Sequence, residues 1–209
     1  MSAGGEIAAR KRQMRAEIKR RLAGMTEDAR RDGSRTICER IVDGVVFARA
    51  RTVMMYLPLP NEVDPRGVGE ACFASGRSVV VPRIGWEDHS LTPCVIGSFE
   101  ETVESGRFGV REPAAGAAAV EPGEIDLVLV PGLAFDDRGG RLGRGAGFYD
   151  RFLRRVARDG SGGDGEDGAR RSWIIGVAFD EQMVESVPGD AHDHPMDWIM
   201  TPTRDIRVG

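Results

Sequence analysis

Short apolar runs alternate along this chain with segments in which apolar residues recur every three or four positions. Short, continuous apolar runs bounded by proline, glycine or polar residues predict buried strands, whereas the three-to-four spacing predicts amphipathic helices. The runs that predict strands are residues 52–57, 78–82, 91–96, 126–131, 173–179 and 198–201, with an extended segment at 108–113.

Helical spacing is clear near the start, where residues 6–23 place Ile7, Met14, Ile18 and Leu22 among basic residues. Thr26 is expected to cap a second helix, because a threonine side chain accepts a hydrogen bond from the free N–H groups of a first turn. Two further helices are predicted over 65–75, with proline in the first turn, and over 147–157.

The alternation of strands and helices predicts an α/β layered domain with a mostly parallel sheet. Ligands of such domains bind at the carboxyl ends of the strands. Three polar motifs follow predicted strands and are therefore expected at this edge: PNEVD at 60–64, PGLAFD at 131–136 and AFDEQ at 178–182.

A glycine-rich loop, Gly143 to Gly147, comes directly before the predicted helix 147–157. Its three alternating glycines tolerate positive φ and let backbone N–H groups approach a ligand closely, and the helix N-terminus adds partial positive charge. A turn that only re-enters the helix would not need three alternating glycines with Arg144 between them. We therefore interpret the loop as a phosphate-binding cradle.

The run RLGRGAGFYDRFL after DLVLVPGLAFD also resembles the nucleotide loop of the 5-formyltetrahydrofolate cyclo-ligase (5,10-methenyltetrahydrofolate synthetase) family. Other stretches match the same family in the same order, and the resemblance covers about residues 8–202: KRQMR at 11–15, YLPLPNEVD at 56–64, and AFDEQ through HDHPMD at 178–197. It implies one three-layer Rossmann-like domain over residues 1–209, resembling the NagB/RpiA/CoA-transferase-like fold.

The resemblance also implies an activity: an ATP- and Mg²⁺-dependent ligase that converts 5-formyltetrahydrofolate to 5,10-methenyltetrahydrofolate through a phosphorylated formyl group. Its matching ATP-binding positions are Lys11, Arg15, Arg141, Gly143, Arg144, Gly145, Ala146, Gly147 and Tyr149, with Arg144 and Lys11 catalytic. The matching substrate positions are Leu57, Glu62, Phe148 and Tyr149, and the matching Mg²⁺ ligands are Asp150 and Asp193.

Residue chemistry supports several of these positions and leaves simpler interpretations open. Lys11 and Arg15 lie four apart, so they share a helix face, which is also common on an ordinary helix surface. Glu62 suits hydrogen bonds from a pterin ring, but a loop acid can also be merely exposed. Asp150 suits Mg²⁺, although an acid in a first helical turn also complements the helix dipole.

Two positions depart from the family pattern. Ala146 stands where many members have lysine or glycine, and Phe148 where they have tyrosine. The loss of a cation at Ala146 keeps an alternative open, a nucleotide- or folate-binding regulator with the same fold and no turnover. His192 and His194 do not favour zinc, because no third ligand is evident.

Composition narrows the functional classes. A net charge of −4 argues against a dedicated nucleic-acid binder, although residues 1–51 carry thirteen Lys and Arg against seven Asp and Glu. There is no Walker-type G-x-x-x-x-G-K-[ST] and no G-x-S-x-G motif. Without a spanning apolar run or a signal peptide, a cytoplasmic enzyme is expected, with no membrane association and no obligate protein partner.

Two further expectations concern segments outside the motifs. The three cysteines, Cys38, Cys72 and Cys94, have no metal-like or disulfide spacing and are expected to be buried thiols. Residues 159–169 read DGSGGDGEDGA, a composition without apolar residues apart from its final alanine, and are expected to form a disordered surface insertion.

Overall fold

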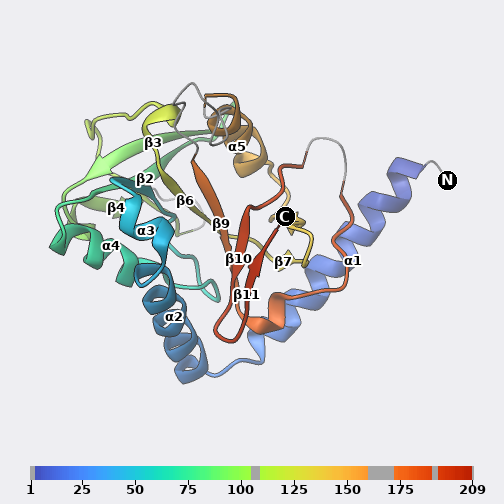
Figure 1. Cartoon of the computed structure of the whole chain (residues 1–209). Helices are drawn as coiled ribbons and strands as arrows, with labels where there is room; N and C mark the ends of the chain where they lie inside the picture. The colour runs from blue at the N-terminus through green and yellow to red at the C-terminus, as the bar shows by residue number, and fades with distance from the viewer. Residues whose placement is uncertain (1–2, 105–108, 160–171, 190–192, 209) are drawn as a thin grey trace, which may run out of the picture.

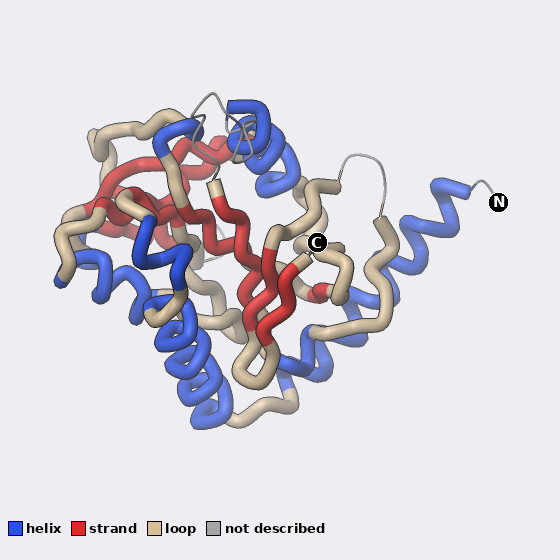
Figure 2. The backbone as a smooth tube through the Cα atoms, in the orientation of Figure 1, coloured by secondary structure: helices blue, strands red, loops and turns tan. Residues whose placement is uncertain are grey.

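The structure, a computed structural model, describes residues 3–104, 109–159, 172–189 and 193–208. A seven-stranded sheet in the order β11-β10-β9-β6-β1-β2-β3 forms its centre (Figures 1 and 2). The strands are β1 (Thr52–Met54), β2 (Ser78–Gly85), β3 (Ser90–Ile96), β4 (Thr102–Glu104), β5 (Arg111–Pro113), β6 (Leu127–Val130), β7 (Ala134–Phe135), β8 (Arg141–Leu142), β9 (Trp173–Val177), β10 (Trp198–Met200) and β11 (Asp205–Arg207).

Helices pack on this sheet and at its edge. They are α1 (Ala3–Ala23), α2 (Glu27–Val42), α3 (Val45–Arg49), α4 (Arg66–Ala74) and α5 (Phe148–Asp159), with short 3₁₀ turns η1 (Phe99–Glu101), η2 (Pro122–Glu124) and η3 (Asp180–Gln182). Thr26 caps α2 as expected, accepting a hydrogen bond from the N–H of Ala29. None of the described helices is long and apolar enough to cross a bilayer.

Side-chain alternation along the strands creates two apolar layers. In β6, Leu127 and Leu129 join the cluster that includes buried side chains of α1, α2, α3 and α4. Val128 and Val130 of the same strand join the opposite cluster, which includes buried side chains of α5. Figure 1 shows α2, α3 and α4 grouped together and α5 apart from them. The domain therefore has three layers, helices, sheet and helix.

Five neighbouring strands, β10, β9, β6, β1 and β2, run parallel, and an antiparallel strand flanks them at each edge. This confirms the predicted α/β class with a mainly parallel sheet; the comparison with a named fold family stays a prediction. The parallel β1, β6, β9 and β10 all end at one edge of the sheet, so the segments that follow them gather there.

Some elements differ from the sequence expectation. Residues 55–57 are buried but lie beyond the end of β1, because the chain leaves the ladder before Pro58. β2 continues to Gly85, three residues beyond the predicted Pro82, because it pairs with β3 along a long hairpin. β5 lies within the extended segment predicted at 108–113. The edge strand β11 and the short strands β4, β7 and β8 were not predicted, since two or three residues carry too little periodicity.

All three cysteines are buried free thiols, as predicted. The expected insertion at 159–169 lies, apart from Asp159, outside the described residues, and so does His192.

Candidate active site

A cavity of about 600 Å³ opens at the carboxyl edge of the sheet. Its wall draws on α1, the segment after β1, the β2–β3 hairpin, the glycine loop and the start of α5. Every candidate site residue from the sequence lines this one cavity: Lys11, Arg15, Leu57, Glu62, Arg141, Gly143, Arg144, Gly145, Ala146, Gly147, Phe148, Tyr149, Asp150 and Asp193. The structure therefore brings them together, while their individual roles stay predictions.

The glycine loop turns sharply before α5. Gly145 (φ 115°) and Gly147 (φ 73°) occupy the left-handed region, which side-chain-bearing residues rarely adopt. Gly143 differs from the expectation, because its φ is not positive; glycine is favoured there because a side chain would crowd Arg141. A Cβ there would lie 3.0 Å from Nη1 of Arg141. The loop thus leads tightly into the N-terminus of α5, where backbone N–H groups favour an anion.

Helix α1 closes one side of the cavity with two cations. Arg15 donates from Nε to the carbonyl oxygen of Gly143 at 3.0 Å, which joins α1 to the glycine loop. Lys11 pairs through Nζ with Oδ2 of Asp193 at 3.1 Å, and its side chain is only 16% exposed. The predicted shared face of Lys11 and Arg15 is therefore a cavity wall rather than open helix surface.

Arg144 and Glu62 form an ion pair between the glycine loop and the segment after β1. Both Nε and Nη2 of Arg144 lie 2.8 Å from Oε1 of Glu62. The other carboxylate oxygen of Glu62 accepts a hydrogen bond from the N–H of Leu59 at 2.9 Å. Glu62 is 10% exposed and Arg144 is 44% exposed, so the acid belongs to the wall and the arginine reaches toward solvent.

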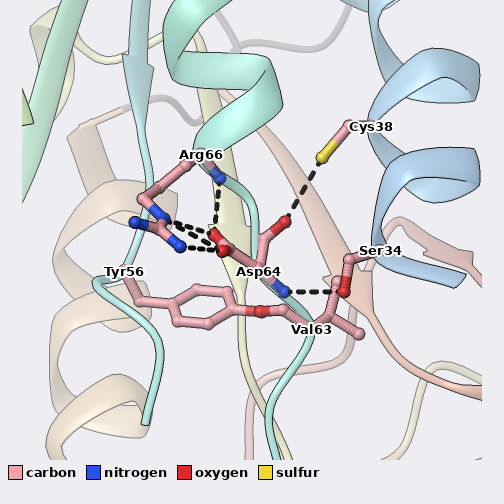
Figure 3. A network of polar contacts seen from close by, with 6 residues as sticks. All are labelled: Ser34, Cys38, Tyr56, Val63, Asp64 and Arg66. Carbon is pink, nitrogen blue, oxygen red and sulfur yellow. Dashed lines mark hydrogen bonds and ion pairs between the residues drawn. The ribbon is translucent and has the colours of Figure 1, made fainter. Parts of the chain in front are cut away.

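A polar network holds the segment that carries Glu62 (Figure 3). The hydroxyl of Tyr56 donates to the carbonyl of Val63 at 2.6 Å. The N–H of Asp64 donates to the hydroxyl of Ser34 on α2, and the carboxylate of Asp64 pairs with the guanidinium of Arg66. The rest of PNEVD therefore anchors the loop, and Glu62 is the carboxylate that this motif presents to the cavity.

Arg141 and Asp150 form a second ion pair in the cavity wall, between β8 and the first turn of α5. The Arg141 side chain is 4% exposed, and its Nη1 donates to the carbonyl of Pro131 at 3.3 Å. Asp150 is thus the partner of a buried cation, a role that neither of its sequence interpretations included. The nine-residue separation hides this pair from the sequence.

Two buried polar atoms in this wall, Nε of Arg141 and the hydroxyl of Tyr149, have no hydrogen-bond partner among the described residues. Burial, together with the charge of Glu62, raises the pKa of Tyr149 well above its usual range, so the hydroxyl keeps its proton. An unpaired buried donor costs about 1–3 kcal/mol. A ligand with an acceptor oxygen or nitrogen would remove that cost.

The donor set for a metal consists of carboxylates. Asp150 and Asp193 both line the cavity, and their ion pairs engage Oδ1 of Asp150 and Oδ2 of Asp193. No group of three His, Cys, Asp or Glu that could hold a metal is present among the described residues. Two hard oxygen ligands fit Mg²⁺, which takes one or two carboxylates and completes its shell with phosphate and water.

Other motif residues turn out to be structural. Gln182 of AFDEQ is buried and donates from Nε2 to the carbonyl of Gly132 at 2.7 Å, so it supports the wall without lining it. Asp136 of PGLAFD accepts hydrogen bonds from the N–H groups of Arg138, Gly140 and Val187. Their position after strands was predicted correctly, but both polar side chains hold loops.

Sequence reasoning missed the hairpin wall and several further basic residues. The additional residues in the cavity wall include Pro82, Ile84, Leu91, Arg111, Arg151 and Arg154. The apolar ones lie on β2 and β3 and read as ordinary core residues in the sequence, because nothing in their spacing shows that β2 extends to the cavity. Arg154 follows Asp150 by one helical turn, which was a usable signal.

Comparison with known proteins decides the family. A model of the 5-formyltetrahydrofolate cyclo-ligase family matches residues 7–202. The chain belongs to the 5-formyltetrahydrofolate cyclo-ligase family. It is 33% identical to the 5-formyltetrahydrofolate cyclo-ligase of Mycolicibacterium smegmatis over 160 residues, 75% of this chain and 76% of that protein. It is 26% identical to the mouse protein of the same name over 195 residues, 91% and 92% of the two chains.

Solved structures of cyclo-ligase relatives agree with this fold. The structure of Aquifex aeolicus 5,10-methenyltetrahydrofolate synthetase superposes with a TM-score of 0.76 at 28% identity, covering 95% of this chain and 92% of that one. A synthetase from Mycoplasma pneumoniae shares the fold, with a TM-score of 0.68 at 20% identity over 92% and 98% of the two chains. Membership confirms the predicted enzyme, a ligase of folate one-carbon metabolism.

Proposed function

We propose that this chain converts 5-formyltetrahydrofolate to 5,10-methenyltetrahydrofolate with ATP and Mg²⁺, releasing ADP and phosphate. The observation that carries this proposal is one cavity whose wall combines a glycine loop at a helix N-terminus, cations from α1 and β8, and the Glu62 carboxylate. The family and the names of its relatives support the same reaction.

The chemistry needs an activated formyl oxygen, because a formamide oxygen is a poor leaving group. In the proposed sequence this oxygen attacks the γ-phosphorus of ATP, the bond to the β,γ-bridging oxygen breaks, and ADP leaves. N10 then attacks the formyl carbon, the carbon–oxygen bond breaks, phosphate departs and N10 loses its proton. The protein must position two substrates and neutralise charge on the moving phosphoryl group, so it needs no nucleophile of its own.

For the nucleotide, we assign the glycine loop, Arg144, Lys11 and Arg15 to the phosphates. Backbone N–H groups before α5 and nearby cations suit the charge that develops on the transferred group. Asp150 and Asp193 would hold Mg²⁺, which supplies further neutralisation of phosphate charge when bound. Ala146 contributes no cation, so Arg144 carries that task within the loop.

For the folate, we assign the apolar wall and the Glu62 carboxylate. Leu57, Ile84 and Leu91 line the cavity near an aromatic side chain, Phe148, and such a wall suits a flat ring. The oxygens of Glu62 accept hydrogen bonds, which matches the N–H donors of a pterin. The unpartnered hydroxyl of Tyr149 offers a donor to the same ligand.

The test is direct. Purified protein is mixed with 5-formyltetrahydrofolate, ATP and Mg²⁺, and the absorbance of the methenyl product is followed; omission of ATP and omission of Mg²⁺ are the controls. ATP-dependent product formation with equimolar ADP supports the proposal. Tight binding of ATP or folate without turnover would refute it and would favour the regulator that Ala146 keeps open.

A further inference from the structure

The tip of the β2–β3 hairpin reaches across to the glycine loop through His89. Nδ1 of His89 lies 2.9 Å from the carbonyl oxygen of Ala146. Its ring stacks on the ring of Phe148, with centroids 5.2 Å apart and planes inclined by 19°. Trp86 from the same tip meets Phe148 edge-on at 5.7 Å. The hairpin thus contacts both the last turn of the loop and the first residue of α5.

The hydrogen bond fixes both a proton and a peptide plane. A carbonyl oxygen can only accept, so Nδ1 of His89 carries the hydrogen in this contact. Arg151 donates from Nη1 to the same oxygen at 3.0 Å, so two side chains hold the Ala146 carbonyl. Because a trans peptide is planar, the N–H of Gly147 points opposite to that carbonyl. The direction of an amide at the entrance to α5 is therefore set from outside the loop.

The backbone of His89 indicates that the imidazole is there for these contacts. His89 has φ 57°, a left-handed conformation that is costly for most residues with a side chain. Asp88 supports the turn by accepting hydrogen bonds from the N–H and hydroxyl of Ser90. Strained conformations persist where the surroundings fix them, and they concentrate at functional sites. Glycine would adopt this turn at less cost.

We propose that His89 is a positioning residue with two separable tasks: its Nδ1–H aligns the glycine loop for the phosphates of ATP, and its ring holds Phe148 in place for the folate. This proposal rests on the proposed function. The first task uses only the backbone of residue 146, so it is available to a loop with alanine at that position.

Three substitutions separate the tasks. Asparagine tolerates the left-handed region and can place an amide N–H near the position of Nδ1, so His89→Asn keeps the donor and loses the ring. His89→Asp has a similar shape but its carboxylate cannot donate. His89→Gly removes the side chain without backbone strain and without adding charge. Melting temperatures establish that each variant is folded before kinetics are measured.

The readouts are the KM values for ATP and for the folate, together with calorimetric binding of a non-hydrolysable ATP analogue. We expect His89→Gly and His89→Asp to weaken the analogue and raise the ATP KM about fivefold, as for one lost hydrogen bond. His89→Asn should keep both within about twofold of wild type while raising the folate KM. A merely structural role would instead move both KM values together in proportion to stability.

Two outcomes would overturn the positioning role. Wild-type affinity for the analogue in His89→Gly would show that the loop aligns itself, and a loss in His89→Asn as large as in His89→Gly would show that the donor is irrelevant. Both results require only a wild-type protein that binds the analogue. Analogue binding without turnover would overturn the proposed reaction and leave the alignment of the loop by His89 testable, whereas a folded wild-type protein that does not bind the analogue would overturn this assignment as well.

Discussion

Glu62 and ATP should compete for Arg144, and this competition can be measured. In the structure Arg144 gives both Nε and Nη2 to one oxygen of Glu62. If that guanidinium binds phosphate, it must leave or share the carboxylate. Replacing Glu62 by glutamine removes the competing charge, so the variant should bind ATP more tightly than wild type does. This direction is unusual, because substitutions in a binding cavity generally weaken binding.

The magnitude follows from exposure. Arg144 is 44% exposed, so water screens the pair and its contribution is about 0.5–1 kcal/mol rather than that of a buried pair. Since 1.4 kcal/mol corresponds to a factor of ten, Glu62→Gln should tighten binding of a non-hydrolysable ATP analogue about two- to fivefold. The folate should respond in the opposite direction, because a charged hydrogen-bond acceptor is lost. A hydrogen bond to a charged group contributes about 1.5–3 kcal/mol, so losing it should raise the KM for the folate roughly ten- to a hundredfold.

The assay is calorimetry with the analogue, followed by steady-state kinetics with each substrate varied. Glutamine retains an oxygen that can accept the N–H of Leu59, so the loop conformation should persist. Glu39→Gln is the matched control, since that exposed acid on α2 does not line the cavity. Weaker analogue binding in Glu62→Gln, with Glu39→Gln unchanged, would refute the competition and indicate that the carboxylate orients Arg144 for the nucleotide.

Three other predictions concern single side chains. Arg144→Ala should cost about 2–4 kcal/mol of transition-state stabilisation, the loss typical of one preorganised donor, and so lower kcat/KM for ATP about thirty- to a thousandfold. A near-normal kcat/KM would mean that the loop backbone alone holds the phosphates. Asp150→Asn should lower activity and should also lower the melting temperature by more than Asp193→Asn does, because it leaves buried Arg141 without its partner. A raised Mg²⁺ concentration should restore part of the rate in each single variant. If both carboxylates bind one ion, the double variant should be little less active than the less active single variant. Burial raises the pKa of the Cys38 thiol to about 11, so its contribution to the free energy of unfolding is complete below about pH 9 and is lost as pH rises toward 11; Cys38→Ala should flatten that decline in chemical denaturation.

The residues that line the cavity could be named from the sequence because they stand in contiguous motifs, although their roles stay predictions. The glycine loop, Glu62 and the pair Lys11 and Arg15 each stand in a short run whose residue types fit one task, and all of them line the cavity. The alternating strand and helix pattern likewise predicted the parallel sheet, because fully buried strands are continuous apolar runs.

What the sequence could not provide is which charges meet. Arg141 on β8 and Asp150 in the first turn of α5 meet only in the folded chain, and no spacing rule for a helix or strand relates them. Gln182 is a polar residue of a kind found in binding sites, but here its buried amide donates to the carbonyl of Gly132 and holds a loop. Its residue type does not distinguish these two uses, because an amide can bond a ligand or a backbone group. The hairpin contact of His89 depends on the length of β2, which tertiary pairing decides.

The Lys11–Asp193 and Arg15–Gly143 contacts have a consequence for how the enzyme is made. They join residues 182 and 128 positions apart, so α1 leaves the ribosome long before its partners exist. Contacts of such separation form late, since the loop entropy must be overcome first. A nascent chain that has not yet released Asp193 should therefore lack the complete cavity, and capture of nucleotide would report that the whole chain has folded. If the cavity binds nucleotide as proposed, bound nucleotide would stabilise only the folded protein, by mass action, and would make detachment of α1 from the cavity less frequent.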